Sequence, residues 1–503
     1  MTVLSRNTVY YGPPGTAKTS HCIGVVLDAL SSGISPGSIG YVTFTRRGIH
    51  EALSRAVELT GQQAAAFPFF KTLHALCFQL SGITGQLIRP AMYREIAKKL
   101  GLQYLAEQEV DYWELPSMNK VIFLHNLART RKWGYEKVVK DIEPEADLNY
   151  YMSCFSYIDR LMLEDNLIDF TGLLERALTA QAPQLEYLIV DEAQDLSTLQ
   201  WEVIRHLAKT SKVTVLAGDD DQSIFSWAGA DPTPLFSPAG FDTVFLAQSF
   251  RVPKQVHKIA AALIDRVSVR VDKQYLPTAS EGQIQIVGEL EEVDMSQGQW
   301  LLLCRHKVLR DKIYNELLEQ GYRVSQAGVD KKLAAVICSN NLLLGGVARI
   351  AEVRVMYEFM QRGQITHGFK ELRGVDNEEM VSLNDLVADY GLVYTPYIHW
   401  STMLTKLSLQ DVIYYKTLER NNELYTEPRI RVSTIHGAKG AEADNVVVFT
   451  DINKRVAETL LTERGLDDET RLFYVAITRT KQNLYVVERT GAIYHFDIFG
   501  EDL

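Results

Sequence analysis

Short apolar segments that run directly into glycine or acidic residues constrain the fold of this chain most strongly. Stretches with helical spacing, such as 19–33, alternate with these segments, and the alternation predicts parallel strands covered by helices on both faces. Ligands bind such sheets at the carboxyl ends of the strands. We therefore expect Gly12, Asp191 and Gly218 to lie at one site. The segments, with their polar endings, are 8–12, 39–45, 186–195 and 212–223.

The second half of the chain repeats this design, and a helix-rich stretch interrupts each half. Strand-like alternation returns near 282–306 and again in 430–451 and 483–489. We interpret the chain as an α/β protein with two cores, each carrying a helical insertion. The predicted division is 1–80 with 166–245 for the first core, 81–165 for its insertion, 246–335 with 426–503 for the second core, and 336–425 for its insertion.

Composition and charge argue against several classes of protein. Hydrophobic residues make up 46% and charged residues 23% of the 503, as in globular proteins, and no run approaches the roughly 18 apolar residues of a membrane helix. A net charge of -11 argues against a broad basic surface, but not against a local phosphate-binding groove. The cysteines form no CxxC pair, which argues against a disulfide framework or a zinc site. They are Cys22, Cys77, Cys154, Cys304 and Cys338. We expect a cytoplasmic protein, from a bacterium or a phage-infected cell, with no membrane partner.

The stretch "GPPGTAKT", residues 12–19, is one residue away from a phosphate-binding loop. Backbone N–H groups of such a loop surround phosphates, a lysine reaches the β and γ phosphates, and a hydroxyl binds Mg²⁺. Lys18 and Thr19 fit these roles, but Ala17 replaces the second glycine. We expect Ala17 at the start of a helix, where alanine is favourable, and we interpret it as a tolerated variant. It would be harmful only if the position needs a positive φ or the closest backbone approach to the phosphates. The alternative is a plain Gly/Pro turn before a helix.

Two acids end the apolar segment "LIVDEAQD" side by side. Adjacent carboxylates repel one another unless a cation compensates them. Asp191 is a candidate Mg²⁺ ligand, and Glu192 a candidate base that orients and deprotonates an attacking water. The alternative is a solvated acidic turn.

The next acidic turn, "GDDDQSIFSWAGA", is followed by aromatic residues. Gln222 is an uncharged side chain suited to sensing a γ phosphate or positioning water. Phe225 and Trp227 alternate, so in an extended segment they share one face, on which bases could stack. The alternative is that both rings belong to the core.

Taken in order, these motifs resemble those of superfamily 1 helicases of the UvrD/Rep/PcrA type. Two RecA-like cores of P-loop type, each with a helical insertion, are the fold that this resemblance implies. Besides 12–19, 190–195 and 218–230, the matching stretches are "YVTFTRRGIHEAL" (41–53), "KTLHALCF" (71–78), "IDFTGLL" (168–174), "LAQSFR" (246–251), "VSTIHGAKGAEADNVVV" (432–448) and "RLFYVAITRTK" (471–481).

Further residue roles follow from the resemblance alone. It implies that Arg251 and Arg479 reach the γ phosphate from the second core and act in catalysis with Lys18, Glu192 and Gln222. The implied ATP-binding residues are Gly12, Pro13, Pro14, Gly15, Thr16, Ala17, Lys18, Thr19, Phe250 and Glu442, and the implied metal ligands are Thr19 and Asp191. The implied DNA-binding residues are Phe44, His74, Phe225, Trp227, Thr434 and His436, although a lone histidine is more often a core residue.

Several departures from the family pattern affect what can be carried over. The family's adenine-reading glutamine lies before the loop, and none of the residues 1–11 is glutamine, so ATP is presumed over other nucleotides. Phe250 stands where a tyrosine is common, and Ala228 where an arginine is frequent.

The resemblance implies an ATP- and Mg²⁺-dependent helicase or translocase that moves 3′ to 5′ on single-stranded DNA. Single-stranded and tailed duplex DNA would be its partners, together with replication or repair proteins, and we expect a monomer. The alternative is a DNA-stimulated ATPase that remodels or recruits partners on DNA without processive unwinding. A nucleotide-binding scaffold without catalysis is disfavoured, because the candidate catalytic residues are all present.

Overall fold

A computed structural model of the chain describes residues 4–43, 46–82, 86–106, 112, 115–325, 330–393, 395–489 and 491–500. The chain forms two compact units. Unit 1 comprises Met1–Asp294, Leu303–Lys307 and Thr434–Leu503, and unit 2 comprises Met295–Leu302 and Val308–Ser433. All residues assigned to the nucleotide and strand sites belong to unit 1.

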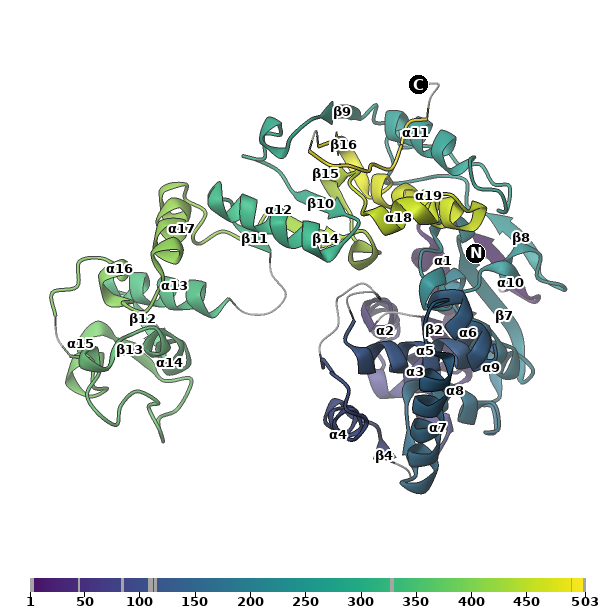
Figure 1. Cartoon of the computed structure of the whole chain (residues 1–503), viewed down its shortest axis with the longest axis horizontal. Coiled ribbons are helices and arrows are strands. Elements are labelled where there is room, and N and C mark those ends of the chain that lie inside the picture. Colours follow the sequence, from purple (N-terminus) through teal and green to yellow (C-terminus); the bar gives the residue numbers. More distant parts are fainter. Residues whose placement is uncertain are drawn as a thin grey trace. The chain divides into compact units, whose positions relative to one another are not determined.

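The first sheet of unit 1 has six strands in the order β3-β2-β6-β7-β1-β8, and its neighbouring strands are parallel. Strands β2, β7 and β8 of this sheet are labelled in Figure 1. The four segments predicted from the sequence form four of these strands. The strands are β1 (Thr8–Tyr11), β2 (Ile39–Thr43), β3 (Phe70–Thr72), β6 (Leu185–Val190), β7 (Ser211–Gly218) and β8 (Asp242–Phe245).

Helices cover both faces of this sheet, because its central strands are apolar on both sides. In β6, Tyr187 and Ile189 pack with α1 (Lys18–Ser31) and α2 (Arg46–Thr60). The alternate residues Leu188 and Val190 pack in a separate cluster on the opposite side. That cluster includes α3 (Leu73–Leu80), α8 (Phe170–Ala177) and α9 (Thr198–Ala208).

A second set of parallel strands follows in the second half of the chain. In unit 1, β16 (Thr480–Val487) pairs in parallel with β15 (Ala443–Phe449) and with β9 (Gln283–Val287). In unit 2, β11 (Val324–Ser325) pairs in parallel with β14 (Ile430–Thr434). The predicted α/β fold class with two parallel-stranded cores is confirmed.

The helix-rich stretches each enclose a hydrophobic cluster of their own. In unit 1 the cluster lies among α4 (Pro90–Leu100), α5 (Ser117–Arg131), α6 (Tyr135–Ile142) and α7 (Leu148–Glu164). In unit 2 it surrounds Trp400 and Tyr357 and involves α13 (Lys331–Leu343), α14 (Ile350–Glu358) and α17 (Leu409–Arg420). Unit 2 also contains a short antiparallel pair, β12 (Val347–Arg349) and β13 (Met380–Ser382), which the sequence patterns do not predict. The finer division into four domains stays a prediction.

Two further observations concern membrane-spanning helices and the cysteines. Among the residues described, no helix is both long and apolar enough to span a bilayer. All five cysteines are buried and none of them forms a disulfide, as expected for thiols that pack as small apolar groups.

Candidate functional site

The loop after β1 lies at the carboxyl end of the first sheet. The Gly12 N–H donates to the Gly218 carbonyl over 3.0 Å, which joins two of the residues predicted to meet. The Lys18 amine donates to the Gly12 carbonyl over 2.5 Å, so the lysine folds across its own loop. A Cβ at position 12 would lie 2.1 Å from the Lys18 Cγ, and one at Gly15 would lie 2.5 Å from the Arg251 Cβ. Glycine is therefore required at both positions.

Ala17 departs from the conformation expected of it. It caps α1 with φ 61° and ψ 38°, in the left-handed region. The Cβ of an L-residue crowds the following carbonyl in this region, at a cost of roughly 1–2 kcal/mol. The expectation of a helical backbone at Ala17 is wrong, and the position is one that glycine would occupy without strain.

The two predicted metal ligands meet at the end of β6. The Thr19 hydroxyl donates to Asp191 Oδ2 over 2.8 Å, and the Tyr41 hydroxyl donates to the same oxygen over 3.0 Å. Burial, followed by the adjacent Glu192 charge, raises the pKa of Asp191 to about 6. A hydroxyl and a buried carboxylate are hard oxygen ligands, which suit Mg²⁺ with water completing its shell. The residues present therefore fit that ion.

Glu192 lies beside this pair, with φ 58° at the turn after the strand. Its carboxylate accepts from the Gln194 amide over 2.5 Å. Burial opposes its charge, but Lys18 and Lys439 hold the pKa of Glu192 below its ordinary value. A carboxylate kept ionised next to the loop can accept a proton from water.

Gln222 contacts Arg479, which lies in the chain between the end of α19 (Glu463–Ile477) and the first residue of β16. The Arg479 guanidinium donates to Gln222 Oε1 over 3.0 Å, and the Gln222 amide donates to Asp219 over 2.6 Å. Burial, then the nearby Arg251, lowers the pKa of Arg479 to about 9. Two predicted catalytic residues that are 257 positions apart in the chain are thus in direct contact.

The segment 249–251 lies directly against the loop. The Ser249 hydroxyl donates to the Pro14 carbonyl over 2.8 Å, and the Phe250 N–H donates to the Gly15 carbonyl over 2.9 Å. The Phe250 ring is 70% exposed, so it is available to stack beside the loop. The Arg251 guanidinium donates to Glu442 over 2.6 Å.

Glu442 also forms an ion pair with Lys481 over 2.8 Å. Burial alone would raise its pKa, but Arg251, followed by Lys481, holds the pKa of Glu442 at about 2. The carboxylate is therefore ionised throughout the physiological range and keeps Arg251 engaged.

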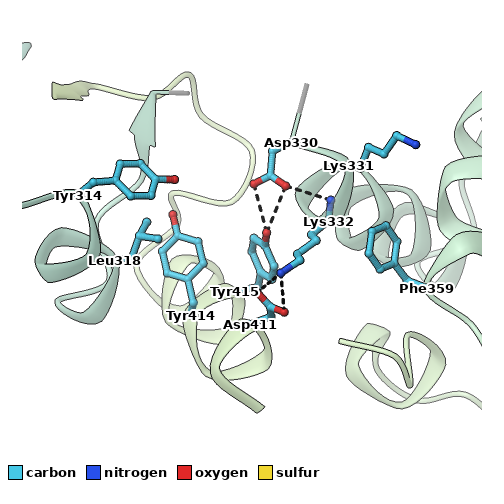
Figure 2. A pocket seen from close by; sticks show the side chains of 9 residues that line it. All are labelled: Tyr314, Leu318, Asp330, Lys331, Lys332, Phe359, Asp411, Tyr414 and Tyr415. Carbon is cyan, nitrogen blue, oxygen red and sulfur yellow. Dashed lines mark hydrogen bonds and ion pairs between the residues drawn. The ribbon is translucent and has the colours of Figure 1, made fainter. Parts of the chain in front are cut away.

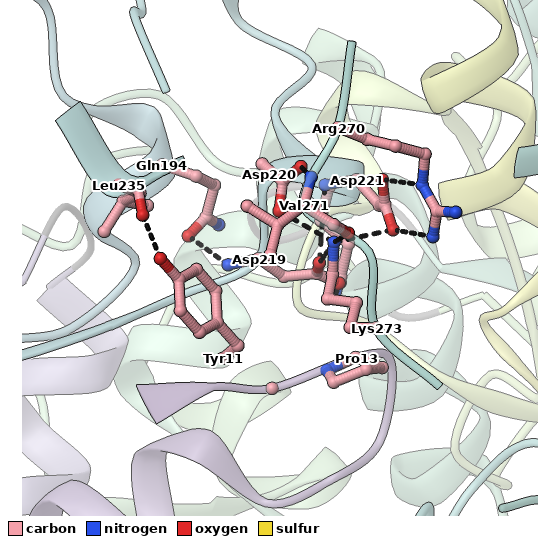
Figure 3. Close-up of polar contacts among 12 residues, drawn as sticks. Tyr11, Pro13, Gln194, Asp219, Asp220, Asp221, Leu235, Arg270, Val271 and Lys273 are labelled. Carbon is pink, nitrogen blue, oxygen red and sulfur yellow. Dashed lines mark hydrogen bonds and ion pairs between the residues drawn. The ribbon is translucent and has the colours of Figure 1, made fainter. Parts of the chain in front are cut away.

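A buried charge cluster lies next to Gln222. The Lys273 amine is within 3.2 Å of Asp219, 2.7 Å of Asp220 and 2.8 Å of Asp221 (Figure 3). Burial alone would lower the pKa of Lys273, but these carboxylates raise it. Arg270 pairs with Asp221 over 2.8 Å. The sequence analysis assigned no role to Lys273, because nothing in its spacing places it next to the three acids.

The sequence analysis also missed Lys439. Its amine donates to Asp195 over 2.6 Å and to the Gln222 carbonyl over 2.8 Å, and it lies 5.2 Å from the centre of the Phe225 ring. Asp195 and Lys439 both occur in stretches that match the helicase motifs, 190–195 and 432–448, so the motifs themselves could have indicated a role for both residues. The lysine connects the acidic turn, the candidate sensor and an aromatic ring.

The aromatic residues after Gln222 meet through His436. The His436 ring centre is 6.1 Å from that of Phe225 and 6.1 Å from that of Trp227. The extended segment on which the prediction of a shared face depended is not found, because Phe225 caps a short 3₁₀ turn at Ser226–Ala228. Trp227 is nevertheless 50% exposed, which leaves ring surface available for stacking.

The remaining predicted strand-lining residues are less clearly placed. The His74 ring packs edge-on against Phe170, with ring centres 5.7 Å apart, and burial lowers the pKa of His74. The Thr434 hydroxyl accepts from the Gly437 N–H over 3.2 Å. Phe44 lies outside the described residues. The DNA-binding roles of all six residues, including Phe225, Trp227 and His436, stay predictions.

Unit 2 contains a separate cavity of about 440 Å³ (Figure 2). Several polar side chains that line it contact one another: the Lys332 amine reaches Asp411 over 2.9 Å, and the Tyr415 hydroxyl donates to Asp330 over 3.2 Å. None of the predicted site residues lines it. The lining residues are Tyr314, Leu318, Asp330, Lys331, Lys332, Phe359, Asp411, Tyr414 and Tyr415.

Comparison with protein families gives two matches. The UvrD/REP helicase N-terminal domain matches residues 1–238, and the UvrD-like helicase C-terminal domain matches residues 357–490. The two matches together span most of the chain, including the loop and the segment with Arg479.

The individual relatives share about a quarter of their residues with this chain over the aligned stretches. The chain is 26% identical over 330 residues to the ATP-dependent DNA helicase PcrA of Staphylococcus epidermidis, covering 60% of this chain and 44% of the relative. It is 26% identical over 294 residues to PcrA of Staphylococcus aureus, covering 54% and 39%. The chain therefore spans less than half the length of these relatives. A solved structure of an arterivirus nonstructural protein 10 helicase with DNA matches with a TM-score of 0.33 and 11% identity, covering 96% of this chain and 61% of that one. A TM-score at that level does not establish a common fold.

Proposed function

The chain belongs to the UvrD/Rep helicase family, and on that premise we propose that it is an ATP-dependent DNA helicase or translocase that moves 3′ to 5′ on single-stranded DNA. One observation supports this most strongly. The loop that follows β7 contacts Arg479 through Gln222 at one end and exposes Trp227 at the other. A change at the nucleotide is thereby transmitted over five residues to an aromatic ring.

The chain's own residues divide the hydrolysis among them. Lys18 binds the β and γ phosphates once it leaves the Gly12 carbonyl, and Glu192 accepts the proton of the attacking water. Mg²⁺ held by Thr19 and Asp191 would withdraw charge from the phosphate oxygens when bound. Arg479 and Arg251 stabilise the charge that develops in the transition state.

Each cation of this site already has a protein partner, which suggests how hydrolysis is coupled to movement. Lys18 contacts Gly12, Arg251 contacts Glu442, and Arg479 contacts Gln222. A bound γ phosphate would take the place of these protein partners and contact the three cations itself. When Arg479 leaves Gln222, the Lys439 contacts to the same segment transmit the change to Phe225.

The ATPase rate with and without single-stranded DNA or RNA tests this function, followed by strand separation on duplexes with a 3′ or a 5′ tail. We expect hydrolysis stimulated by DNA and unwinding of the 3′-tailed duplex. Lys18→Ala should abolish hydrolysis, whereas Lys454→Ala, at an exposed lysine, should leave it unchanged. Stimulation without unwinding would instead favour an ATPase that remodels partners on DNA. ATP hydrolysis by the Lys18→Ala variant would refute the assignment of the loop.

A further inference from the structure

The loop that presents Trp227 rests on helix α5 of the first helical insertion. The Arg131 guanidinium, at the end of α5, donates to the Ser226 carbonyl over 2.6 Å. Gly229, with φ 101°, brings the backbone so close to α5 that a Cβ there would lie 3.2 Å from the Thr130 hydroxyl. The backbone on both sides of Trp227 is therefore held by the same helix.

Earlier on α5, Phe123 stacks on the Trp227 ring. The two ring centres are 6.0 Å apart and the planes differ by 14°. The Tyr112 ring centre lies 4.9 Å from that of Phe123. Trp227 still exposes 50% of its surface, so Phe123 covers part of the ring and leaves the rest open. The His436 ring is perpendicular to it, at 6.1 Å.

We infer that Phe123 is a positioning residue for single-stranded DNA: it fixes Trp227 in the orientation that receives a base. The inference rests on the proposed function and adds to it a residue of the insertion, outside every stretch matched to the helicase motifs. An exposed indole on a loop samples several rotamers, and a base must select one of them. A stacked aromatic partner selects that rotamer beforehand, which reduces the entropy lost on binding.

A purely structural role for Phe123 makes a different prediction, so the two can be separated. Phe123 is only partly buried and packs at the border of the hydrophobic cluster of α4–α7. Phe123→Leu keeps most of that apolar packing and removes the stacked ring. Phe155 is 1% exposed within the same cluster, and its ring packs with those of His125, Tyr135 and Tyr151. Phe155→Leu is therefore the matched control for weakened packing of the insertion.

The experiment is a double-mutant cycle with a fluorescent single-stranded oligonucleotide, using the full chain. We expect Phe123→Leu to weaken binding about 2- to 10-fold and Trp227→Ala to weaken it about 5- to 150-fold. The double variant should bind no more weakly than Trp227→Ala, because Phe123 acts through that ring. Phe123→Tyr, which keeps an aromatic ring at this position, should bind the oligonucleotide as tightly as the wild type. Phe155→Leu should also leave the affinity unchanged.

A second measurement does not depend on DNA. The emission of Trp227 is obtained as the difference between each protein and its Trp227→Phe counterpart. We expect Phe123→Leu to shift this emission to longer wavelength and to increase its quenching by acrylamide, with no such change in Phe155→Leu.

The outcomes separate the inference from the function on which it rests. Additive losses in the cycle would mean that Phe123 contacts DNA independently, and an unchanged affinity of Phe123→Leu would mean that it has no role; either result overturns the inference while DNA binding stands. Absence of single-strand binding and of DNA-stimulated hydrolysis in the wild type would overturn the proposed function, and the inference with it.

Discussion

Replacing Ala17 with glycine isolates the strain that the structure places in the phosphate-binding loop. At φ 61° and ψ 38° an alanine costs roughly 1–2 kcal/mol that a glycine does not. Glycine also gains freedom in the unfolded chain, which offsets about 0.4–1 kcal/mol of this. Ala17→Gly should therefore raise the free energy of unfolding by about 0.8 kcal/mol, which is the difference between the midpoints of the two ranges. The melting temperature should rise by about 1–3 °C.

Calorimetry without nucleotide measures this directly, and Ala29→Gly is the matched control. Ala29 lies in the interior of the same helix α1 and is 1% exposed, so glycine there loses about 1 kcal/mol of helix propensity and a buried methyl group. The same substitution should thus stabilise at position 17 and destabilise at position 29. A loss of stability at both positions would refute the left-handed conformation. The ATPase rate should change less than about twofold if free and bound loops carry the same strain, and a large rise would show that the strain impairs nucleotide use.

Three further predictions concern the site. Arg479→Ala should leave nucleotide affinity largely intact and lower turnover by about 10³-fold or more; equal losses in a binding titration and in the steady-state rate would indicate a structural role. Glu192→Gln should lower the ATPase rate by about 10²–10⁴-fold while the protein retains bound ATP in a filter assay, and normal turnover would remove it as the base. Burial, with Arg305 and Lys439, lowers the pKa of His436 to about 3. The folded state therefore binds fewer protons than the unfolded state below the ordinary histidine pKa of about 6.5, and stability falls as the pH drops through that value towards 3. His436→Gln should lose this part of the pH dependence in urea titrations, by up to about 1.4 kcal/mol per pH unit, and an identical slope in both proteins would contradict the shift.

The first sheet could be predicted from the sequence because its strands are apolar and end in recognisable chemistry. Residues 8–11 form β1 as predicted, and the acids after β6 lie at the expected edge. The pair β12 and β13 could not be predicted, because strands of three residues carry too little alternation to distinguish them from loops.

Within the site, local patterns predicted residue types and positions but not the contacts between distant segments. The meeting of Thr19 with Asp191 follows from where strands end, and was expected. The contacts of Lys439 with Asp195 and of Lys273 with Asp219 depend on how separate segments pack, which the sequence of a single chain does not reveal. The backbone at Ala17 could not be read from a propensity, because the loop geometry overrides it.

The cluster around Lys273 restricts the order in which a diverging lineage could change its residues. Three aspartates face Lys273, and Asp221 also faces Arg270. If Asp219 or Asp220 is replaced, two carboxylates still face the two cations. If the lysine is replaced first, three buried carboxylates are left with one arginine, and an uncompensated buried charge costs about 3–5 kcal/mol. Descendants of this protein can thus vary at a single acid while keeping the lysine, and a homologue without the lysine should already lack at least one of the acids.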